Sequence, residues 1–258
     1  MKQLSPNFDL VETPKLLRIW VWIQIWAHVI CGVCTLSFAF PFLDRRNKDR
    51  KIQRWSKRLL NIFHIELVVQ GAHLLENTPH LIASNHISWL DIHVINTFEP
   101  IRFVAKSEVE GWPVFGWMAK QLGTVFIRRD SARHARQVVS QMVEVLNTES
   151  ICIFPEGTST TGDSVLPFKP NLFESAIAAK VPVYPLVIKY LSKATGTQSE
   201  SPAFIGDMGL LESMSNVITN RNLVAQITVL PASPKGQVSI MDRKQLANYC
   251  QECIANAL

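Results

Sequence analysis

The stretch Leu81-Ile82-Ala83-Ser84-Asn85-His86-Ile87-Ser88-Trp89-Leu90-Asp91 contains the clearest structural signal in this 258-residue chain. Its first four residues form an apolar run that suits a buried strand, and a helical pattern begins at Trp89. The loop between them places His86 five positions before Asp91, and loops at strand ends commonly hold catalytic groups. A histidine near an aspartate is more often a packing or capping residue than a base, so the other motifs must decide.

Strand-like and helical stretches alternate over the remainder of the chain. The predicted strands cover residues 66–70, 81–84, 102–105, 124–127, 150–154, 183–189 and 223–229. The predicted helices cover residues 89–96, 112–121, 131–148, 171–180 and 243–257. This alternation predicts an α/β fold with a central mixed sheet flanked by helices. Residues 192–216 are rich in Ser, Thr and Gly and predict a long loop.

The N-terminal part of the chain is strongly apolar. Residues 19–43 contain no charge over 25 positions, and as a helix they would be about 38 Å long against about 30 Å of hydrocarbon. Three tryptophans near the start of this run suit interfacial anchors, and a basic cluster follows its end, so we expect membrane attachment with the main domain in the cytoplasm. Spanning and interfacial attachment both stay open, and a cleaved signal peptide or a buried core helix are weaker alternatives.

The basic cluster lies between Asp44 and Arg58. It contains eight Lys or Arg residues against two Asp residues, about +6, compared with a net charge of +5 for the whole chain. Such a patch favours an anionic partner. The sequence has no signature of a nucleic-acid-binding module, so we expect a membrane surface and no nucleic acid.

A helix is predicted over residues 44–63, with its apolar residues toward one face. This helix suits either an anionic lipid surface or packing on the core. We divide the chain into membrane-associated helices at residues 1–64 and a main domain at residues 65–258.

The five cysteines include two C-x-x-C pairs, Cys31 with Cys34 and Cys250 with Cys253. Such pairs can bind zinc. The first pair lies within the apolar N-terminal run and the second within the predicted C-terminal helix, so we expect reduced thiols and no metal site.

Further motifs that suit chemistry follow the predicted strands. Glu156-Gly157-Thr158 comes directly after the apolar run at 150–154, and Gly157 permits a positive φ or a close backbone approach. Arg128 and Arg129 follow the strand at 124–127 and offer forked donors to a phosphate or carboxylate. Lys106 follows the strand at 102–105. Each of these alone is more often an ordinary turn or surface residue.

The order of these motifs resembles the four-block pattern of the glycerolipid acyltransferase family. The blocks are His86-x4-Asp91, Gly123-x2-Phe126-Ile127-x-Arg129, Phe154-Pro155-Glu156-Gly157-Thr158 and Val181-Pro182-Val183-Tyr184-Pro185-Leu186. The resemblance covers residues 65–190 and is closest to the bacterial 1-acylglycerol-3-phosphate acyltransferases. A membrane-attached N-terminus with a basic flank also fits that family.

The resemblance implies acyl transfer from an acyl-CoA or acyl-carrier protein thioester to the free hydroxyl of a lysolipid at the inner membrane. His86 would deprotonate the hydroxyl and Asp91 would support it, with no cofactor, metal or covalent acyl-enzyme. The substrate-binding residues implied by the resemblance or placed beside them are Lys106, Arg128, Arg129, Glu156, Gly157, Thr158 and Pro182. Of these, Arg129 with Glu156 and Gly157 would surround the head group, with Arg128 beside Arg129, and Pro182 would shape the acyl or acceptor pocket.

Two positions depart from the family pattern. Ser159 stands where an arginine is common, and Phe168-Lys169-Pro170-Asn171 replaces a common Phe-Lys-x-Gly. Both departures fall in the block assigned to the head group, so lyso-ornithine lipid stays open as the alternative acceptor to lysophosphatidic acid. A non-catalytic lipid-binding adaptor is a more distant alternative. A secreted hydrolase is disfavoured because the Gly-x-Ser-x-Gly motif is absent.

Overall fold

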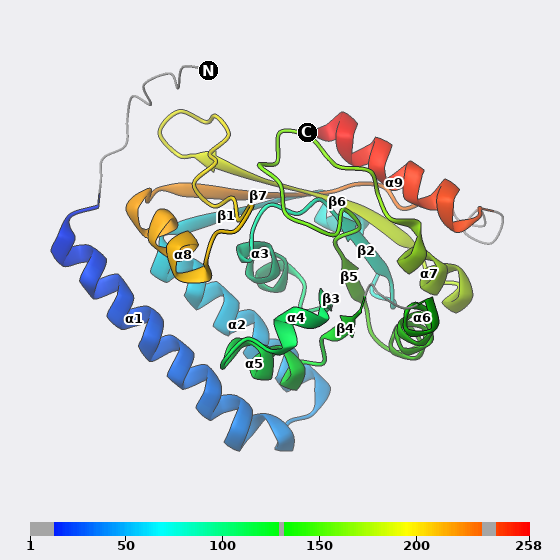
Figure 1. Ribbon diagram of the computed structural model, residues 1–258, viewed down its shortest axis with the longest axis horizontal. Coiled ribbons are helices and arrows are strands. Elements are labelled where there is room, and N and C mark those ends of the chain that lie inside the picture. The colour runs from blue at the N-terminus through cyan, green and yellow to red at the C-terminus, as the bar shows by residue number, and fades with distance from the viewer. Residues whose placement is uncertain (1–12, 129–131, 234–240) are drawn as a thin grey trace.

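The computed structural model describes residues 13–128, 132–233 and 241–258, and within them the chain forms a mixed α/β sandwich (Figure 1). The described residues contain one sheet of seven strands in the order β1-β7-β6-β2-β5-β3-β4. Neighbouring strands are parallel except for β6 and β7, which pair antiparallel. The strands are β1 (Ile65–Gln70), β2 (Leu81–Ser84), β3 (Arg102–Lys106), β4 (Val125–Ile127), β5 (Ile151–Ile153), β6 (Val183–Ser192) and β7 (Leu223–Val229).

Helices cover both faces of the sheet. The first face is packed by α1 (Lys15–Cys34), α2 (Arg45–Phe63), α3 (Leu90–Phe98) and α8 (Leu210–Thr219). The second face is packed by α6 (Ala132–Leu146), α7 (Glu174–Ala179) and α9 (Arg243–Ala257). The short helices α4 (Ser107–Glu110) and α5 (Phe115–Gln121) lie between β3 and β4 along the chain. The predicted fold class is therefore confirmed.

All seven predicted strands are present, and β6 continues three residues beyond its predicted end at residue 189. The long loop predicted over residues 192–216 is wrong at its end, because α8 begins at Leu210. The buried residues of α8 follow a helical spacing that extends past the predicted loop: Ser213, Met214, Val217 and Ile218. The helix α4 was also missed, since it has only four residues.

Helix α2 uses its apolar face for packing on the protein core. The Asp44 carboxylate accepts a hydrogen bond from the Asn47 N–H and caps the helix, and Leu59, Leu60 and Phe63 are buried. The sequence left open whether this helix packs on the core or lies on a lipid surface. Its apolar side packs on the core, and its basic residues stay at the surface. The division at residue 64 coincides with the passage from α2 to β1, but both parts contribute to one hydrophobic core.

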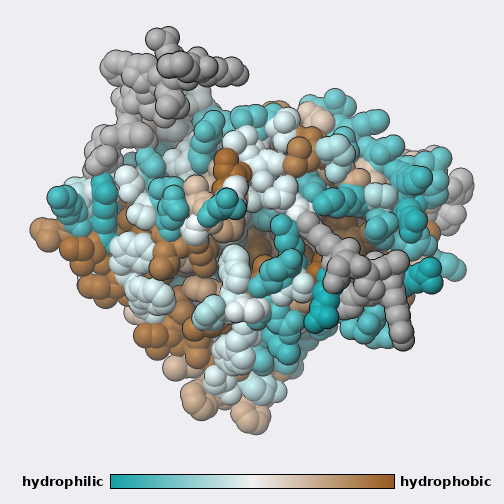
Figure 2. Space-filling view, viewed as in Figure 1, coloured by the Kyte–Doolittle hydropathy of each residue, from teal (hydrophilic) through white to brown (hydrophobic). Residues whose placement is uncertain are grey.

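Helix α1 presents two apolar faces. Val21, Ile25 and Val29 are buried against the body of the protein. The opposite face is exposed, and Figure 2 shows it as a hydrophobic band along one side of the molecule. We call this surface, together with the helical turns that follow α1, the outer stripe. Its residues are Leu16, Ile19, Trp20, Ile23, Trp26 and Ile30 on α1, and Phe38 and Phe42 on the turns after it.

Such a continuous exposed apolar surface is unusual for a soluble protein and is consistent with membrane association. In the described part of the chain, the segment Lys15–Phe42 is long and apolar enough to cross a bilayer, although a third of its most apolar window is buried in the protein.

Gly71, directly after β1, provides a test of how tightly β1 is fixed against β7. Its φ is +70°, and a Cβ atom there would lie 2.3 Å from the carbonyl oxygen of Val229. Gly196 has nearly the same φ, +71°, but a Cβ atom there would meet nothing within 4 Å. The two positions therefore share the left-handed conformation and differ only in the overlap.

We expect Gly196→Ala to lower the free energy of unfolding by about 1 kcal/mol because of the left-handed backbone. Gly71→Ala should lower it by a further 1–3 kcal/mol or so, because the Val229 carbonyl must move. Urea unfolding of both variants in one detergent measures the difference. Equal losses in the two variants would contradict the close packing of β1 on β7.

Candidate active site

The sheet brings the predicted functional segments to one edge. Strands β2, β5, β3 and β4 are parallel neighbours, so their carboxyl ends lie side by side. In register, Ala83 pairs with Ile153, and Val104 pairs with Val125. His86 and Glu156 each follow the first pair by three residues. Loops from strands that are separate in sequence therefore meet at this edge.

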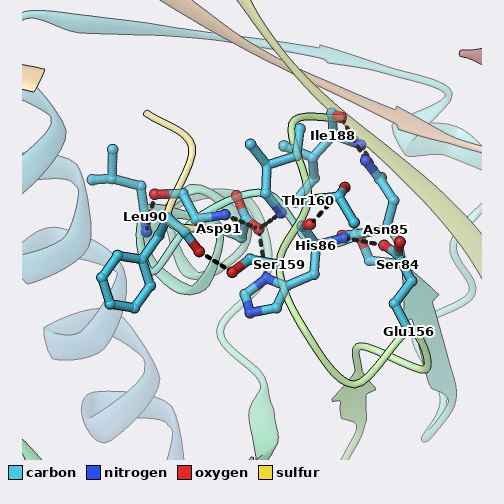
Figure 3. A network of polar contacts seen from close by, with 12 residues as sticks. Ser84, Asn85, His86, Leu90, Asp91, Glu156, Ser159, Thr160 and Ile188 are labelled. Carbon is cyan, nitrogen blue, oxygen red and sulfur yellow. Dashed lines mark hydrogen bonds and ion pairs between the residues drawn. The ribbon is translucent and has the colours of Figure 1, made fainter. Parts of the chain in front are cut away.

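His86 is hydrogen bonded to Asp91 at this edge (Figure 3). The Nδ1 atom of His86 lies 2.8 Å from Oδ2 of Asp91, which is fully buried on the first turn of α3. An ionised carboxylate can only accept hydrogen bonds, so Nδ1 carries the proton and Nε2 keeps its lone pair. Figure 3 shows the second ring nitrogen turned away from Asp91. The imidazole can therefore accept a proton at Nε2.

The Asp91 carboxylate accepts three more hydrogen bonds. The N–H groups of Ile87 and Ser88 donate to Oδ2 at 2.7 and 2.9 Å, and the Tyr190 hydroxyl donates to Oδ1 at 2.7 Å. In the two backbone bonds a side chain of the first helical turn reaches back to earlier N–H groups, as the acidic residue of a capping box does, and they curl the loop so that the His86 ring faces the carboxylate. Four donors around one buried carboxylate compensate for its lost hydration.

The face of the His86 ring is covered by Phe154. Their ring centroids are 4.1 Å apart at an interplanar angle of 16°, and Phe103 stacks on the other side of Phe154 at 6.1 Å. The His86 side chain keeps 21% of its surface exposed. The ring is therefore held on one face and accessible to a substrate at its edge.

Glu156 supports the backbone of the same loop. Its Oε1 accepts the N–H of His86 at 2.7 Å, and its Oε2 accepts the N–H of Leu166 at 2.9 Å. Burial raises the pKa of Glu156, and the two backbone hydrogen bonds partly oppose that shift. In this geometry Glu156 holds His86 in place, in contrast to the contact with a head group that the resemblance implies.

Asn85 fixes the end of β2 to β6. Its side-chain amide donates to the carbonyl oxygen of Ile188 at 3.0 Å and accepts from the Ile188 N–H at 2.8 Å. The residue is fully buried. These two bonds continue the ladder between β2 and β6 where the β2 backbone turns away into the His86 loop.

Two further loops close around His86 and Ile87. The N–H of Thr160 donates to the His86 carbonyl at 2.8 Å, and the N–H of Phe204 donates to the Ile87 carbonyl at 2.9 Å. The Ser159 hydroxyl donates to the Phe204 carbonyl. The predicted loop region around residue 204 thus forms one wall of the site, a role that its composition did not indicate.

The other predicted site residues do not all lie beside the His86–Asp91 pair. Lys106 is the last residue of β3, and Arg128 directly follows β4; both side chains are exposed. From the spacing of the strands, the end of β3 lies about 10 Å from the end of β2, and the end of β4 lies about 14 Å from it. Gly157 has a φ of +73° and donates to the Phe154 carbonyl, and Thr158 is exposed. Arg129 lies outside the described residues.

Pro182 lies at the opposite edge of the sheet. Its carbonyl oxygen accepts the N–H of Leu81, the first residue of β2, whereas His86 follows the last residue of that strand. Five residues of extended chain separate the two edges by about 16 Å. The structure therefore does not bring Pro182 to the His86–Asp91 pair, and a direct role in the pocket is not supported.

Three residues that hold the site were not identified from the sequence: Asn85, Phe154 and Tyr190. Asn85 and Phe154 belong to the sequence motifs quoted above, but no pattern in the sequence indicated their roles. Tyr190 had no local signal, because it lies 99 positions from Asp91 and beyond the predicted end of its strand.

A histidine held in this way can act as a base that removes a proton from a hydroxyl or water. Among the described residues, the His86 ring makes no hydrogen bond to a Ser, Thr or Cys side chain that would serve as a nucleophile. This geometry suits direct attack by the acceptor on an activated carbonyl.

Comparisons with known proteins identify the family. Residues 66–189 match the family model described as Acyltransferase. The lyso-ornithine lipid O-acyltransferase of Pseudomonas aeruginosa is 34% identical over 82% of this chain and 79% of that protein. The 1-acyl-sn-glycerol-3-phosphate acyltransferase of Neisseria gonorrhoeae is 33% identical over 67% of each chain. The chain belongs to the acyltransferase family.

The fold has a counterpart among solved structures. The crystal structure of the 1-acyl-sn-glycerophosphate acyltransferase PlsC from Thermotoga maritima aligns with a TM-score of 0.70 over 94% of this chain and 93% of that chain, at 22% identity. The mixed sheet with its flanking helices is therefore shared with that enzyme. Membership of the family makes this protein an O-acyltransferase, which implies a lipid acceptor and an acyl donor.

The support that Glu156 gives to His86 can be tested by Glu156→Ala. The change leaves two partly buried N–H groups without their acceptor, and because water can reach them in part, each costs about 1–2 kcal/mol. We expect a loss of about 2–4 kcal/mol in the free energy of unfolding, with a fall in kcat because the His86 loop is no longer fixed. Thermal unfolding and acyl transfer at saturating substrate measure both effects.

The control is Glu252→Ala, which removes an exposed carboxylate from α9. It should leave both quantities within error. Wild-type melting and turnover in Glu156→Ala would contradict the role assigned to this carboxylate.

Proposed function

We propose that the protein transfers a fatty acyl group from acyl-CoA or acyl-carrier protein to the free hydroxyl of 1-acylglycerol-3-phosphate, giving phosphatidic acid. The observation that carries the proposal is the His86–Asp91 pair, with Nδ1 bound to a buried carboxylate and Nε2 available. The family supports acyl transfer as the reaction. The identity of the acceptor lysolipid is the part of the proposal that family membership does not supply.

In the proposed reaction, Nε2 of His86 takes the proton of the acceptor hydroxyl as its oxygen attacks the thioester carbonyl. The tetrahedral intermediate then collapses, the new ester C–O bond remains, and the C–S bond to the carrier breaks. The imidazolium returns its proton to the departing thiolate. Asp91 stabilises the imidazolium while it carries the charge. The thioester is already activated, so the scheme uses no metal or cofactor.

A phosphate on the acceptor is supported by cations along the same edge of the sheet. Lys106 and Arg128 are exposed at the ends of β3 and β4, on the side where His86 follows β2. A head group bound there would have its glycerol hydroxyl toward His86. Guanidinium and ammonium groups are the usual partners of phosphate.

A second acceptor, lyso-ornithine lipid, is supported by two observations. Ser159 is uncharged, and its hydroxyl is used to hold the Phe204 carbonyl, so this position offers no cation to a phosphate. The Pseudomonas lyso-ornithine lipid enzyme also aligns over a larger share of this chain than the Neisseria enzyme does, 82% against 67%.

We also propose that α1 lies along the membrane surface and does not cross it. The helix packs lengthwise on the body through Val21, Ile25 and Val29, so a spanning orientation would draw the adjoining charged helix α2 into the hydrocarbon. An in-plane orientation places the outer stripe in the apolar layer and the basic residues of α2 near anionic head groups. This orientation suits the cytoplasmic leaflet of the inner membrane.

Acyl transfer can be tested with purified wild type and His86→Ala. Without the base, the rate should fall by about 10² to 10⁴ while the protein stays folded. His73→Ala is the matched control, since His73 is exposed on a short 3-10 turn away from the site, and it should retain full activity. Full activity in His86→Ala would remove the basis of the proposed reaction.

The acceptor is decided by competition in the same assay. Equal concentrations of lysophosphatidic acid and lyso-ornithine lipid are mixed with one thioester donor, and both products are quantified. A larger kcat/KM for lysophosphatidic acid supports the first acceptor. A preference for lyso-ornithine lipid supports the second, and turnover of neither by an enzyme that acylates other lysolipids would overturn both.

Membrane attachment can be tested by Ile23→Lys together with Ile30→Lys on the outer stripe. Replacing these exposed apolar side chains should reduce partition onto anionic vesicles at least about tenfold, because apolar burial in the bilayer is lost. Leu211→Lys places one lysine at an exposed leucine of α8 outside the stripe and should bind as wild type. Sedimentation with the vesicles measures partition.

The orientation of α1 is tested separately with an epitope tag before residue 1, in spheroplasts of a bacterium that expresses the protein. Both ends of an in-plane helix stay on the cytoplasmic side, so the tag should resist protease added from outside. A tag at the C-terminus serves as the internal reference. Cleavage of the N-terminal tag alone would show that α1 spans the membrane.

A further inference from the structure

We infer that Tyr190 is a positioning residue of the acyl-transfer site, holding Asp91 so that its other oxygen faces the ring of His86. The inference rests on the His86-dependent acyl transfer proposed above, and it does not depend on which lysolipid is the acceptor. It is based on the hydrogen bond from the Tyr190 hydroxyl to Oδ1 of Asp91, at 2.7 Å.

The two oxygens of Asp91 have different surroundings. Oδ2 accepts from His86, Ile87 and Ser88, all within the loop that carries the base. Oδ1 accepts from Tyr190, which belongs to the distant strand β6. Rotation of the carboxylate about its side-chain bonds would exchange or misalign the two oxygens. The bond to Tyr190 opposes that rotation from outside the loop.

Tyr190 is itself firmly held. Its side chain is fully buried. On one side its backbone pairs with Ala225 of β7, and on the other side its carbonyl accepts the Ser199 N–H at 2.8 Å. Since the backbone is fixed on both sides, the hydroxyl has a defined position relative to the sheet. The sheet thereby sets the orientation of a carboxylate that belongs to α3.

The hydroxyl stays a donor at all working pH values. Burial, and then the charge of Asp91, raise the pKa of Tyr190 well above its usual value. The other titratable groups that face the pair come from β5 and the loop after it: Cys152, whose pKa burial also raises, and Glu156. Neither is altered by a change at Tyr190, so a shift in pH dependence can be assigned to the lost hydroxyl.

Removing the hydroxyl has a defined chemical consequence. The negative charge of Asp91 is then shared with one donor fewer, so the carboxylate attracts the imidazolium proton of His86 more strongly. The charged imidazolium is thereby stabilised relative to the neutral imidazole that acts as base. The acid limb of the pH profile of kcat/KM should therefore move upward.

The test is Tyr190→Phe in the full-length enzyme, with the acceptor that wild type prefers. We expect kcat to fall by roughly tenfold with KM values within twofold, because a hydrogen bond to a charged group is lost and substrate contacts are not. The acid limb should move by about half a pH unit or more. A merely structural hydrogen bond would lower the melting temperature and leave the acid limb in place.

Tyr184→Phe is the matched control. Tyr184 is buried on the same strand, six positions earlier and on the same face, and its hydroxyl accepts the N–H of Glu76. This variant should show the stability effect of a lost tyrosine hydroxyl without any change in the pH profile. An equal shift in both variants would overturn the inference.

A double-mutant cycle tests whether Tyr190 acts through Asp91. In the Asp91→Asn background, Tyr190→Phe should change kcat less than twofold, whereas independent action would give the full tenfold loss again. Additive losses would overturn the inference. Wild type without turnover of any lysolipid would instead refute the proposed function, while active wild type and an unchanged profile in Tyr190→Phe would refute this inference alone.

Discussion

The burial of the Asp91 carboxylate is the constraint on which the site depends. An ionised carboxylate without contact to water is strongly unfavourable unless several donors replace its hydration. Here the donors are two backbone N–H groups of the His86 loop, the His86 ring and the Tyr190 hydroxyl. Each of these groups must keep its position for the carboxylate to stay buried. The requirement for satisfied hydrogen bonds and the requirement for an oriented base are therefore met by the same contacts.

The topology of the sheet delivers those groups. Parallel pairing of β2 with β5 and β6 places the loops of His86 and Glu156 at one edge, beside the middle of the long strand β6. The antiparallel partner β7 supports β6 beyond that edge, where Tyr190 lies. The antiparallel pairing of β7 with β6 thus supports the part of the sheet that carries Tyr190.

The sequence predicted the strands well because they are short, nearly continuous apolar runs, as in β2 and β5. The His86–Asp91 contact was predicted because the other motifs follow this pair in the order of the acyltransferase pattern, whereas the spacing of the two residues alone did not decide it. The location of Pro182 at the opposite edge could not be predicted, because the order of motifs along the chain does not say which edge of the sheet each motif occupies. The direction of the Glu156 side chain and the contact of Tyr190 depend on tertiary packing, for which neither residue carries a local pattern.

The same core connects the outer stripe to α3, the helix that carries Asp91. Helix α1 packs on α2, and α2 packs on α3, whose first turn carries Asp91. The Trp55 ring of α2 stacks on His28 of α1 at 4.3 Å and contacts the edge of His93 on α3 at 5.3 Å. These aromatic contacts pack the three helices closely against one another. A bilayer that holds the outer stripe would then also fix the height of His86 relative to the lipid surface, which an enzyme with a membrane-bound acceptor requires.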